Sequence, residues 1–442
     1  MSLAEPGKPY DSLGEWWYVD APENRVRGRV SYVPAGTISL SLYCGREKLG
    51  SMHPELLHGQ CGGREVTLMD VHYDAHSWAK GGIEETQFEA ERLLIGEHFQ
   101  RKDFTFSELS ARFDQLENWI GHSPFDWKAI KHDHRHVAAS FVAPEPTEVE
   151  VLPNGMRILF DPELSPGISG QHFIVKYQCR VRILPNEPKS IFWFETKLGT
   201  LASLLSLLAD SAMHPVELLG QTGSQEDKAP FIIFAPGWDP RAGPTGAWKH
   251  IIFYHLIEGS FAPIVQNWFA FADAYRPVWT ALVDGIYYPG QFLESQLLGT
   301  VQALEGLHRR DFEGVYISSE DFEEVRKAVV GAIPQGTDPA LRQALKEKLT
   351  WGNEFSLRKR LRQLLASIPQ SLADAVGRKK IQQLPDELTE TRNALAHCVD
   401  PPKQAPDMWL FHLTMQSRLL LKLLVLRKIG VPDDVIAKAI TF

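Results

Sequence analysis

The feature that most constrains the fold of this chain is a change of sequence pattern near residue 260. Before it, short runs rich in Val, Ile, Tyr and Phe alternate with Gly, Pro and Asn, which is typical of an antiparallel sandwich or barrel-like region. After it, apolar residues recur at helical spacing over long stretches. The chain has 442 residues, more than a single core usually holds. We therefore predict an α+β multidomain protein, with a β-rich domain over residues 1–259 and an all-α helical bundle over 260–442.

The elements expected in each domain follow from this pattern. The β-rich domain is predicted to hold strands at 14–19, 27–33, 37–44, 65–71, 147–153, 156–162, 172–185 and 231–236, with a short helix at 200–212. The bundle is predicted to hold helices at 260–275, 291–310, 319–333, 338–349, 353–368, 385–399 and 406–430. Ser319 is a candidate N-cap and Gly430 a candidate C-cap.

Charge and composition narrow the classes of protein. The formal net charge of −9 argues against a protein that coats nucleic acid in general, and the acidic excess lies before residue 291. No run of 18 or more uncharged apolar residues is present, and the first residues do not resemble a secretion signal. Four widely separated cysteines without a C-x-x-C motif indicate reduced, mostly structural thiols. We expect a cytoplasmic protein that does not span a membrane.

Three polar residues in the segment TRNALAHCVD form the main candidate for chemistry. Arg392 and His397 are five positions apart, a spacing expected about once by chance in a chain of this composition. Asn393 directly follows the arginine, and on a helix Asn393 and His397 lie on one face as an i, i+4 pair. The long Arg392 side chain can reach this face from its flank. The alternative is structural: Arg392 forms a surface ion pair and His397 caps the helix C-terminus.

This segment resembles the Arg-Asn-x-x-x-His signature of HEPN ribonucleases. FLESQLLGTVQALEGLHRR (292–310) resembles the first long helix of the ApeA-like HEPN branch, and GEWWYVDAPENRVRGRVSYV (14–33) with REVTLMD (64–70) is similar to the N-terminal domain that accompanies it. The resemblance covers most of the chain, although residues 75–170 contribute little to it. It favours the catalytic interpretation of Arg392, Asn393 and His397 over the structural one.

The resemblance implies a metal-independent endoribonuclease without a cofactor, which acts as a homodimer whose two motifs line one cleft. ApeA-like proteins are bacterial anti-phage factors of the abortive type, so a phage-derived trigger at the N-terminal domain is implied as well. By position, Arg392 would steady the scissile phosphate, His397 would act as general acid or base, and Asn393 would orient the phosphate or the histidine. Glu305 is a candidate partner that holds Arg392, or else an ordinary surface charge.

Two basic clusters are candidates for contact with RNA phosphates. Both stand in the nearly neutral C-terminal part of the chain, which holds 21 Lys and Arg against 19 Asp and Glu from residue 291 onward. The alternative is a solvated helix face, whose buried side would be formed by the leucines of the same helix. The residues are Arg358, Lys359, Arg360 and Arg362 in one cluster and Arg378, Lys379 and Lys380 in the other.

Other constellations give weaker signals. His132, His134 and His136 would face one way on a strand, as a zinc site could use, or belong to a solvated polar segment. His72 and His76 lack a completing ligand set, so we expect them to be structural. No P-loop, G-x-G-x-x-G or G-x-S-x-G motif occurs in the sequence.

Two rival functions remain open at this stage. One is a HEPN module that no longer cuts RNA and serves as a binding or dimerisation partner, although Arg, Asn and His are all intact here. The other is a carbohydrate- or peptide-binding β domain with a helical dimerisation tail, for which Trp16, Trp17, Trp78 and Trp119 would offer stacking surfaces. Aromatic residues in β domains are more often part of the core.

Overall fold

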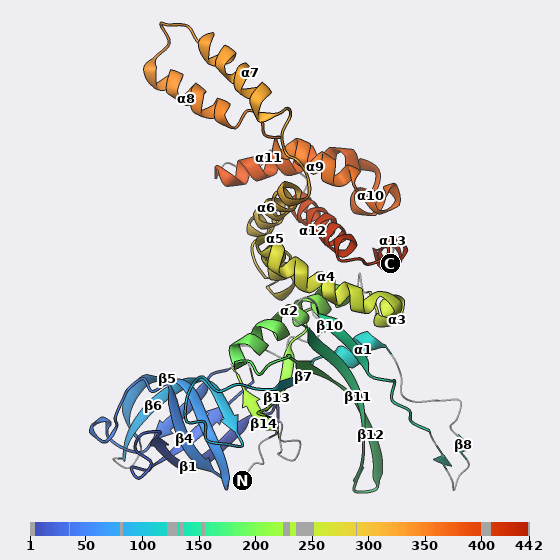
Figure 1. Cartoon of the computed structure of the whole chain (residues 1–442). Helices are drawn as coiled ribbons and strands as arrows, with labels where there is room; N and C mark the ends of the chain where they lie inside the picture. The colour runs from blue at the N-terminus through green and yellow to red at the C-terminus, as the bar shows by residue number, and fades with distance from the viewer. Residues whose placement is uncertain are drawn as a thin grey trace. The chain divides into compact units, whose positions relative to one another are not determined.

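A computed structural model describes residues 5–34, 36–79, 83–121, 131–132, 137–138, 140–151, 155–223, 230–235, 252–288, 290–398 and 408–440. The chain divides into two compact units, Met1–Phe269 and Ala270–Phe442, which are taken separately below. The first unit is β-rich and contains a barrel, and the second is helical (Figure 1). The predicted fold class is therefore confirmed.

A closed antiparallel barrel forms the N-terminal part of the first unit (blue in Figure 1). The strand order is β6-β3-β2-β1-β4-β5, and β5 pairs back with β6 to close the ring. Inward and outward side chains alternate, as in the ISLSL segment of β3, whose isoleucine and leucines are buried. The strands are β1 (Tyr10–Tyr18), β2 (Val26–Tyr32), β3 (Ile38–Leu42), β4 (Leu56–Cys61), β5 (Arg64–Ala79) and β6 (Ile83–Ile95).

One large side chain fills much of the space between β1 and its neighbours. Trp16 is 1% exposed, and its ring lies over Gly59 of β4, where an added Cβ would come within 2.5 Å of the indole. A Cβ at Gly28 of β2 would lie 3.1 Å from the same indole. Glycine is thus required at Gly59 so that the backbone can approach the tryptophan.

An open sheet continues from the barrel through the second half of β6. It runs through β14 (Phe231–Phe234), β13 (Pro215–Gln221), β7 (Glu108–Phe113), β12 (His172–Leu184), β11 (Met156–Ser169) and β10 (Thr147–Val151). Helix α2 (Ile191–Ala209) belongs to the same unit and buries most of its last ten residues. It begins nine residues before the predicted start, because the Ser190 hydroxyl caps it by accepting from the Trp193 N–H (3.4 Å). The unit also holds the short elements α1 (Leu116–Ile120), β8 (Lys131–His132), β9 (Val137–Ala138) and α3 (Tyr254–Ile257). Helix α4 (Phe261–Ala274) follows them and crosses the division between the two units.

The helical unit is organised around α6 (Leu293–Asp311). Its buried stripe, which includes Leu297, Val301, Leu304 and Leu307, follows the spacing of a core-facing helix. The other helices are α5 (Arg276–Tyr287), α7 (Ser319–Gly331), α8 (Pro339–Thr350), α9 (Leu357–Ala366), α10 (Gln370–Gly377), α11 (Leu384–Ala396), α12 (Trp409–Lys428) and α13 (Asp433–Ile440).

Two predicted caps in this unit have different outcomes. The N-cap of α7 is Ser318 and not Ser319, since the Ser318 hydroxyl accepts from the Asp321 N–H (3.1 Å). Gly430 follows the end of α12 with φ +93°, the left-handed conformation expected of a glycine that terminates a helix.

Two helices, α2 and α12, are long and apolar enough to cross a membrane by length and composition alone. More than half of each apolar stretch is buried within the protein, as in the core helices of soluble proteins. The burial of these two helices is consistent with a soluble protein.

Candidate functional site

Helix α11 carries the three candidate catalytic residues at its C-terminal end. Pro385 in the first turn and the acidic residues that follow it favour helix initiation at Leu384. Leu388 and Thr391 are buried and anchor one face of the helix against the bundle. Arg392 is half-buried on the adjoining face, whereas Asn393 and His397 are exposed. The motif thus lies at the margin of the core and remains accessible to a ligand.

The three side chains belong to the last turn of α11 and its cap. Arg392 Nη1 donates to Asn393 Oδ1 at 3.2 Å, so the asparagine amide steadies the guanidinium. His397 is the C-cap residue, and its backbone N–H still donates to the Asn393 carbonyl (3.2 Å), which keeps the helical i, i+4 relation. Cys398 follows with φ +53° and ends the helix. A guanidinium has five N–H donors, so its bond to Asn393 leaves capacity for phosphate oxygens.

The predicted pairing of Glu305 with Arg392 is corrected by the structure. Glu305 Oε1 accepts from Arg309 at 3.0 and 3.1 Å, one turn along α6. Arg309 also contacts Glu354 Oε2 (2.7 Å). Residues at i and i+4 on one helix already lie side by side, so Glu305 pairs with Arg309 of its own helix.

The predicted RNA-contact residues of α9 differ in their surroundings. Arg358 and Arg362 contact Asp386 of α11 at 2.8 and 2.9 Å, and Arg358 also contacts Glu390 (3.2 Å). Lys359 Nζ lies over the rings of Phe355 and Tyr316, 3.6 and 4.0 Å from their centroids. These cations remain partly exposed. The side chains of Arg378, Lys379 and Lys380 lie outside the described part of the chain.

Arg360 is not a surface residue, which contradicts its predicted role in RNA contact. It is 2% exposed, and its guanidinium donates to the Phe355 carbonyl (3.0 Å) and to Glu354 Oε2 (3.1 Å). Its Nη1 also lies 3.2 Å from His308 Nδ1. The sequence placed Arg360 in a basic run, but its position on α9 is one residue before buried Leu361, on the side that faces α6.

The contact with Arg360 fixes the protonation of His308. A guanidinium can only donate, so His308 Nδ1 must accept, and its Nε2–H then donates to Gln363 Oε1 (2.7 Å). Burial lowers the pKa of His308, and the positive charges of Arg360 and Arg309 lower it further. His308 is therefore a neutral structural histidine at the centre of the bundle.

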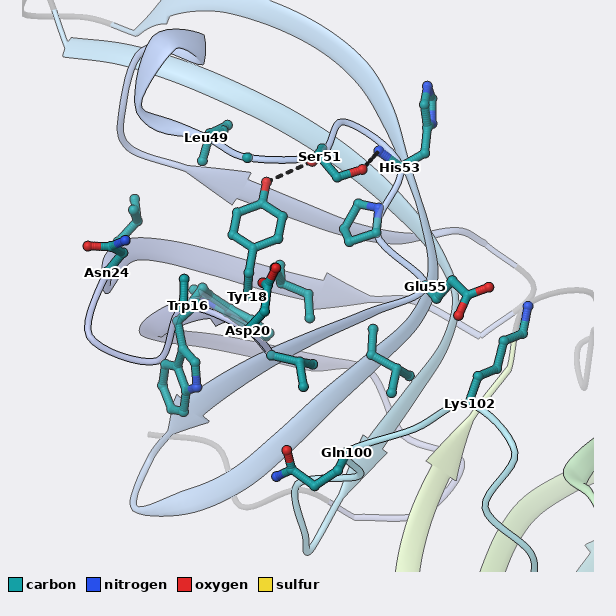
Figure 2. Close-up of a pocket in the computed structure, with 18 of the residues that line it drawn as sticks. Trp16, Tyr18, Asp20, Asn24, Leu49, Ser51, His53, Glu55, Gln100 and Lys102 are labelled. Carbon is teal, nitrogen blue, oxygen red and sulfur yellow. Dashed lines mark hydrogen bonds between the residues drawn. The ribbon is translucent and has the colours of Figure 1, made fainter.

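A cavity of about 760 Å³ lies at one end of the barrel (Figure 2). Tyr18 closes one wall, because its hydroxyl donates to the Ser51 carbonyl (2.8 Å). Asp20 and Glu55 contribute acidic groups to the lining, and the Lys102 side chain extends toward Glu55 in Figure 2. No sequence motif marked this cavity, since its walls come from three separate segments between residues 16 and 103.

The tryptophans proposed as stacking surfaces are mostly core residues. Trp16 is 1% exposed, and Trp119 is fully buried, with its Nε1–H donating to the Ile252 carbonyl (2.8 Å). Trp17 is 6% exposed and packs edge-on against His98. The side chain of Trp78 lies outside the described residues. Trp16, Trp17 and Trp119 therefore belong to the core of the β-rich domain and do not form an exposed stacking surface.

The histidine clusters give no metal site among the described residues, where no group of three His, Cys, Asp or Glu side chains is placed to hold an ion. His76 Nδ1 lies 3.3 Å from Thr86 Oγ1, and the His72 ring lies beside His53. The side chain of His132, together with His134 and His136, falls outside the described part of the chain.

The structure defines a two-domain protein, in which a barrel-containing β domain is followed by a helical domain that carries Arg392, Asn393 and His397 at the end of α11. Residues 11–268 match the family model for ApeA N-terminal domain 1, and residues 298–435 match the model for the Apea-like HEPN domain. The chain therefore belongs to the ApeA family of HEPN proteins, as the sequence resemblance predicted. In the comparisons with curated proteins and with solved structures, nothing matched the chain significantly. HEPN domains are generally ribonucleases, so membership supports a nuclease-type protein.

Proposed function

We propose that this protein is a metal-independent endoribonuclease that cleaves RNA through Arg392, Asn393 and His397. The observation that carries the proposal is the placement of all three residues in the last turn and cap of α11, accessible and linked by the Arg392–Asn393 hydrogen bond, within the segment that matches the HEPN family. The structural alternative is met in one half only: His397 is the C-cap residue of α11, whereas among the described residues the contact of the Arg392 guanidinium is with Asn393 and not with an acidic side chain.

The chemistry follows from the residue types. His397 acts as general acid or base on the 2'-hydroxyl or the leaving 5'-oxygen, because an imidazole titrates near neutrality. The 2'-oxygen attacks phosphorus, the bond to the 5'-oxygen breaks, and the products are a 2',3'-cyclic phosphate and a 5'-hydroxyl. Arg392 offsets the charge that develops on the phosphoryl oxygens. Asn393 keeps the guanidinium in place.

No metal is needed in this scheme. The acidic residues of α11 lie before the motif, and Asp386 and Glu390 are engaged by Arg358 and Arg362. The RNA supplies its own nucleophile, so a metal-bound water is not required.

The proposal extends to the biological role and the partners. We place the protein in the cytoplasm as an abortive-infection factor against phage, with RNA as the substrate and the N-terminal domain as a sensor of a phage-derived trigger or as a restraint. The barrel cavity of about 760 Å³ is the candidate trigger site. Two helical domains pair so that two copies of the motif share one cleft.

A non-catalytic HEPN binding module with a ligand-binding β domain is the second candidate, and the same barrel cavity favours it. RNA ends from cells that express the wild type or His397→Ala separate the two candidates. If the protein is a nuclease, cells that express the wild type should contain new 5'-hydroxyl RNA ends that are absent with His397→Ala. Identical RNA ends in both cultures, under conditions that trigger the wild type's toxicity, would support the binding module.

A further inference from the structure

Helices α7 and α8 form an arm that projects from the helical unit (Figure 1). None of the residues of α7 and α8, all of which the structure describes, is buried. The apolar residues of such a helix pair are not explained by packing within the pair, because none of its side chains is buried.

The base of the arm is nevertheless connected to the helical unit by a β-bridge and several hydrogen bonds. Val315 bridges Glu354 across the neck. The Asn353 side chain accepts from the N–H groups of Tyr316 and Ile317 and donates to the Ile317 carbonyl (3.2, 3.1 and 2.8 Å). Arg360, through the Phe355 carbonyl and Glu354, ties the same neck to the core. The arm is thus presented on a fixed support.

Large apolar side chains are concentrated on this segment. Of the 20 large hydrophobic residues that are exposed in the described chain, eight fall between residues 315 and 351. On the helices themselves they form two i, i+4 pairs, Val325 and Val329 on α7 (49% and 44% exposed) and Leu341 and Leu345 on α8 (54% and 36%). Exposed pairs at this spacing make a continuous stripe on each helix.

Both stripes lie on the same side of the arm. On each helix the exposed apolar residue comes one position before a less exposed residue, Arg326 after Val325 and Lys346 after Leu345. We take the less exposed residues to face the partner helix. Because the helices run in opposite directions, the same one-residue offset turns both stripes to one side.

The heights along the arm also match. Counted from the bridge between Val315 and Glu354, Val325 lies level with Leu345, and Val329 with Leu341. Near the base, Asp321 lies level with Lys348, and both are exposed. Helix α7 carries four acidic and two basic residues, whereas α8 carries three basic and one acidic.

We infer that this face of the arm binds the same face of a second copy of the chain, giving a four-helix bundle with a two-fold axis along the arm. That axis sets α7 of each copy against α8 of the other at equal height, so Val325 meets Leu345 of the other copy and Asp321 meets Lys348 of the other copy. The charges of the two copies are complementary only when the bases of the two arms lie at the same end of the bundle. This contact does not depend on nuclease activity.

Cross-linking between differently marked full-length chains tests the contact directly. One chain carries Val325→Cys and the other Leu345→Cys, both with Cys398→Ser, since the other three cysteines are buried. We expect a disulfide between the two chains under mild oxidation in the mixture, and far less when either chain is alone. A disulfide within one chain cannot form, because each chain carries one accessible cysteine.

Charge reversal is the second part of the test. Asp321→Lys in both chains is expected to lower the cross-linking yield roughly tenfold, because like charges then meet across the axis. Asp321→Lys in the Leu345→Cys chain mixed with Lys348→Glu in the Val325→Cys chain places the two reversed sites against each other and restores the yield. Circular dichroism checks that each variant keeps its helix content. Absence of the mixed disulfide, or a yield unchanged by charge reversal, overturns the inference and leaves the face to a different partner.

Discussion

Arg392 donates a hydrogen bond from Nη1 to Oδ1 of its neighbour Asn393, at 3.2 Å. Adjacent residues on a helix point about 100° apart, so only a long side chain that folds across the surface can make this contact. The bond turns the guanidinium toward the face that also carries His397. In the proposed mechanism, Asn393 is therefore a positioning residue for the arginine.

The first prediction concerns this positioning role. Asn393→Ala is expected to lower kcat for RNA cleavage roughly ten- to hundredfold, less than the thousandfold or larger losses expected for Arg392→Ala or His397→Ala. The physical reason is that Asn393→Ala keeps Arg392 and His397 and loses only the hydrogen bond that orients the guanidinium. Single-turnover cleavage of a labelled RNA measures all three variants. Equal losses for Asn393→Ala and Arg392→Ala would assign the asparagine a direct role.

The second prediction separates the buried from the exposed arginine of α9. Arg360→Ala is expected to lower the free energy of unfolding by about 3 kcal/mol, because it leaves His308 Nδ1 and the Phe355 carbonyl without their donor inside the bundle. Arg362→Ala, whose side chain is 58% exposed, should change it by less than about 1 kcal/mol. Urea denaturation followed by circular dichroism measures both.

Variants at the same two positions test RNA contact. Arg362→Ala is expected to weaken RNA binding several-fold at low salt and to lower the salt dependence of the affinity. Arg360→Gln, in contrast, should leave the affinity of the folded fraction unchanged. A matching loss in the two variants would return Arg360 to the RNA surface.

The third prediction concerns the barrel. Gly59→Ala is expected to lower the free energy of unfolding by about 1–3 kcal/mol, since the new methyl group would overlap the Trp16 ring. Gly199→Ala in α2 is the matched control: nothing lies within 4 Å of its added Cβ, so helix propensity should raise stability by about 0.5–1 kcal/mol. Thermal unfolding compares the two, and a neutral Gly59→Ala would argue against this packing.

The fourth prediction concerns pH. The folded pKa of His308 is lowered, so below pH 6.5 the unfolded chain takes up a proton that the folded chain does not. The free energy of unfolding contributed by this residue therefore falls as pH decreases from 6.5. Nitrogen-15 chemical shifts, assigned with His308→Gln, should show a neutral ring protonated at Nε2 at pH 7 and a titration midpoint lower in the folded than in the unfolded chain. A ring protonated at Nδ1, or a midpoint above that of the unfolded chain, would contradict this assignment.

The sequence predicted the fold class and several elements, for physical reasons that particular residues show. Strands such as β3 alternate cleanly, and α6, α9 and α12 repeat apolar residues at helical spacing. Strand β6 was missed because its four glutamates favour helix or loop by propensity. Its pairing with β3, β5 and β14 overrides that preference.

The site was predictable only in part. The motif on α11 follows from local spacing, since one helix places all three residues. The partners of Glu305 and Arg360, in contrast, depend on side chains from neighbouring turns and on which face of α9 meets α6. The barrel cavity required tertiary structure, because it gathers segments that are far apart in the chain.

The most direct test of the nuclease assignment is cleavage of a labelled RNA in excess EDTA by the wild type and by His397→Ala, each shown to be folded by circular dichroism. We predict that the wild type cuts RNA without a metal and leaves 5' ends that accept phosphate from a kinase. His397→Ala should not cut, and RNA with a 2'-deoxy nucleotide at the cut position should resist cleavage. Activity that is lost in EDTA and returns with magnesium or manganese, or cleavage by folded His397→Ala, would contradict the mechanism.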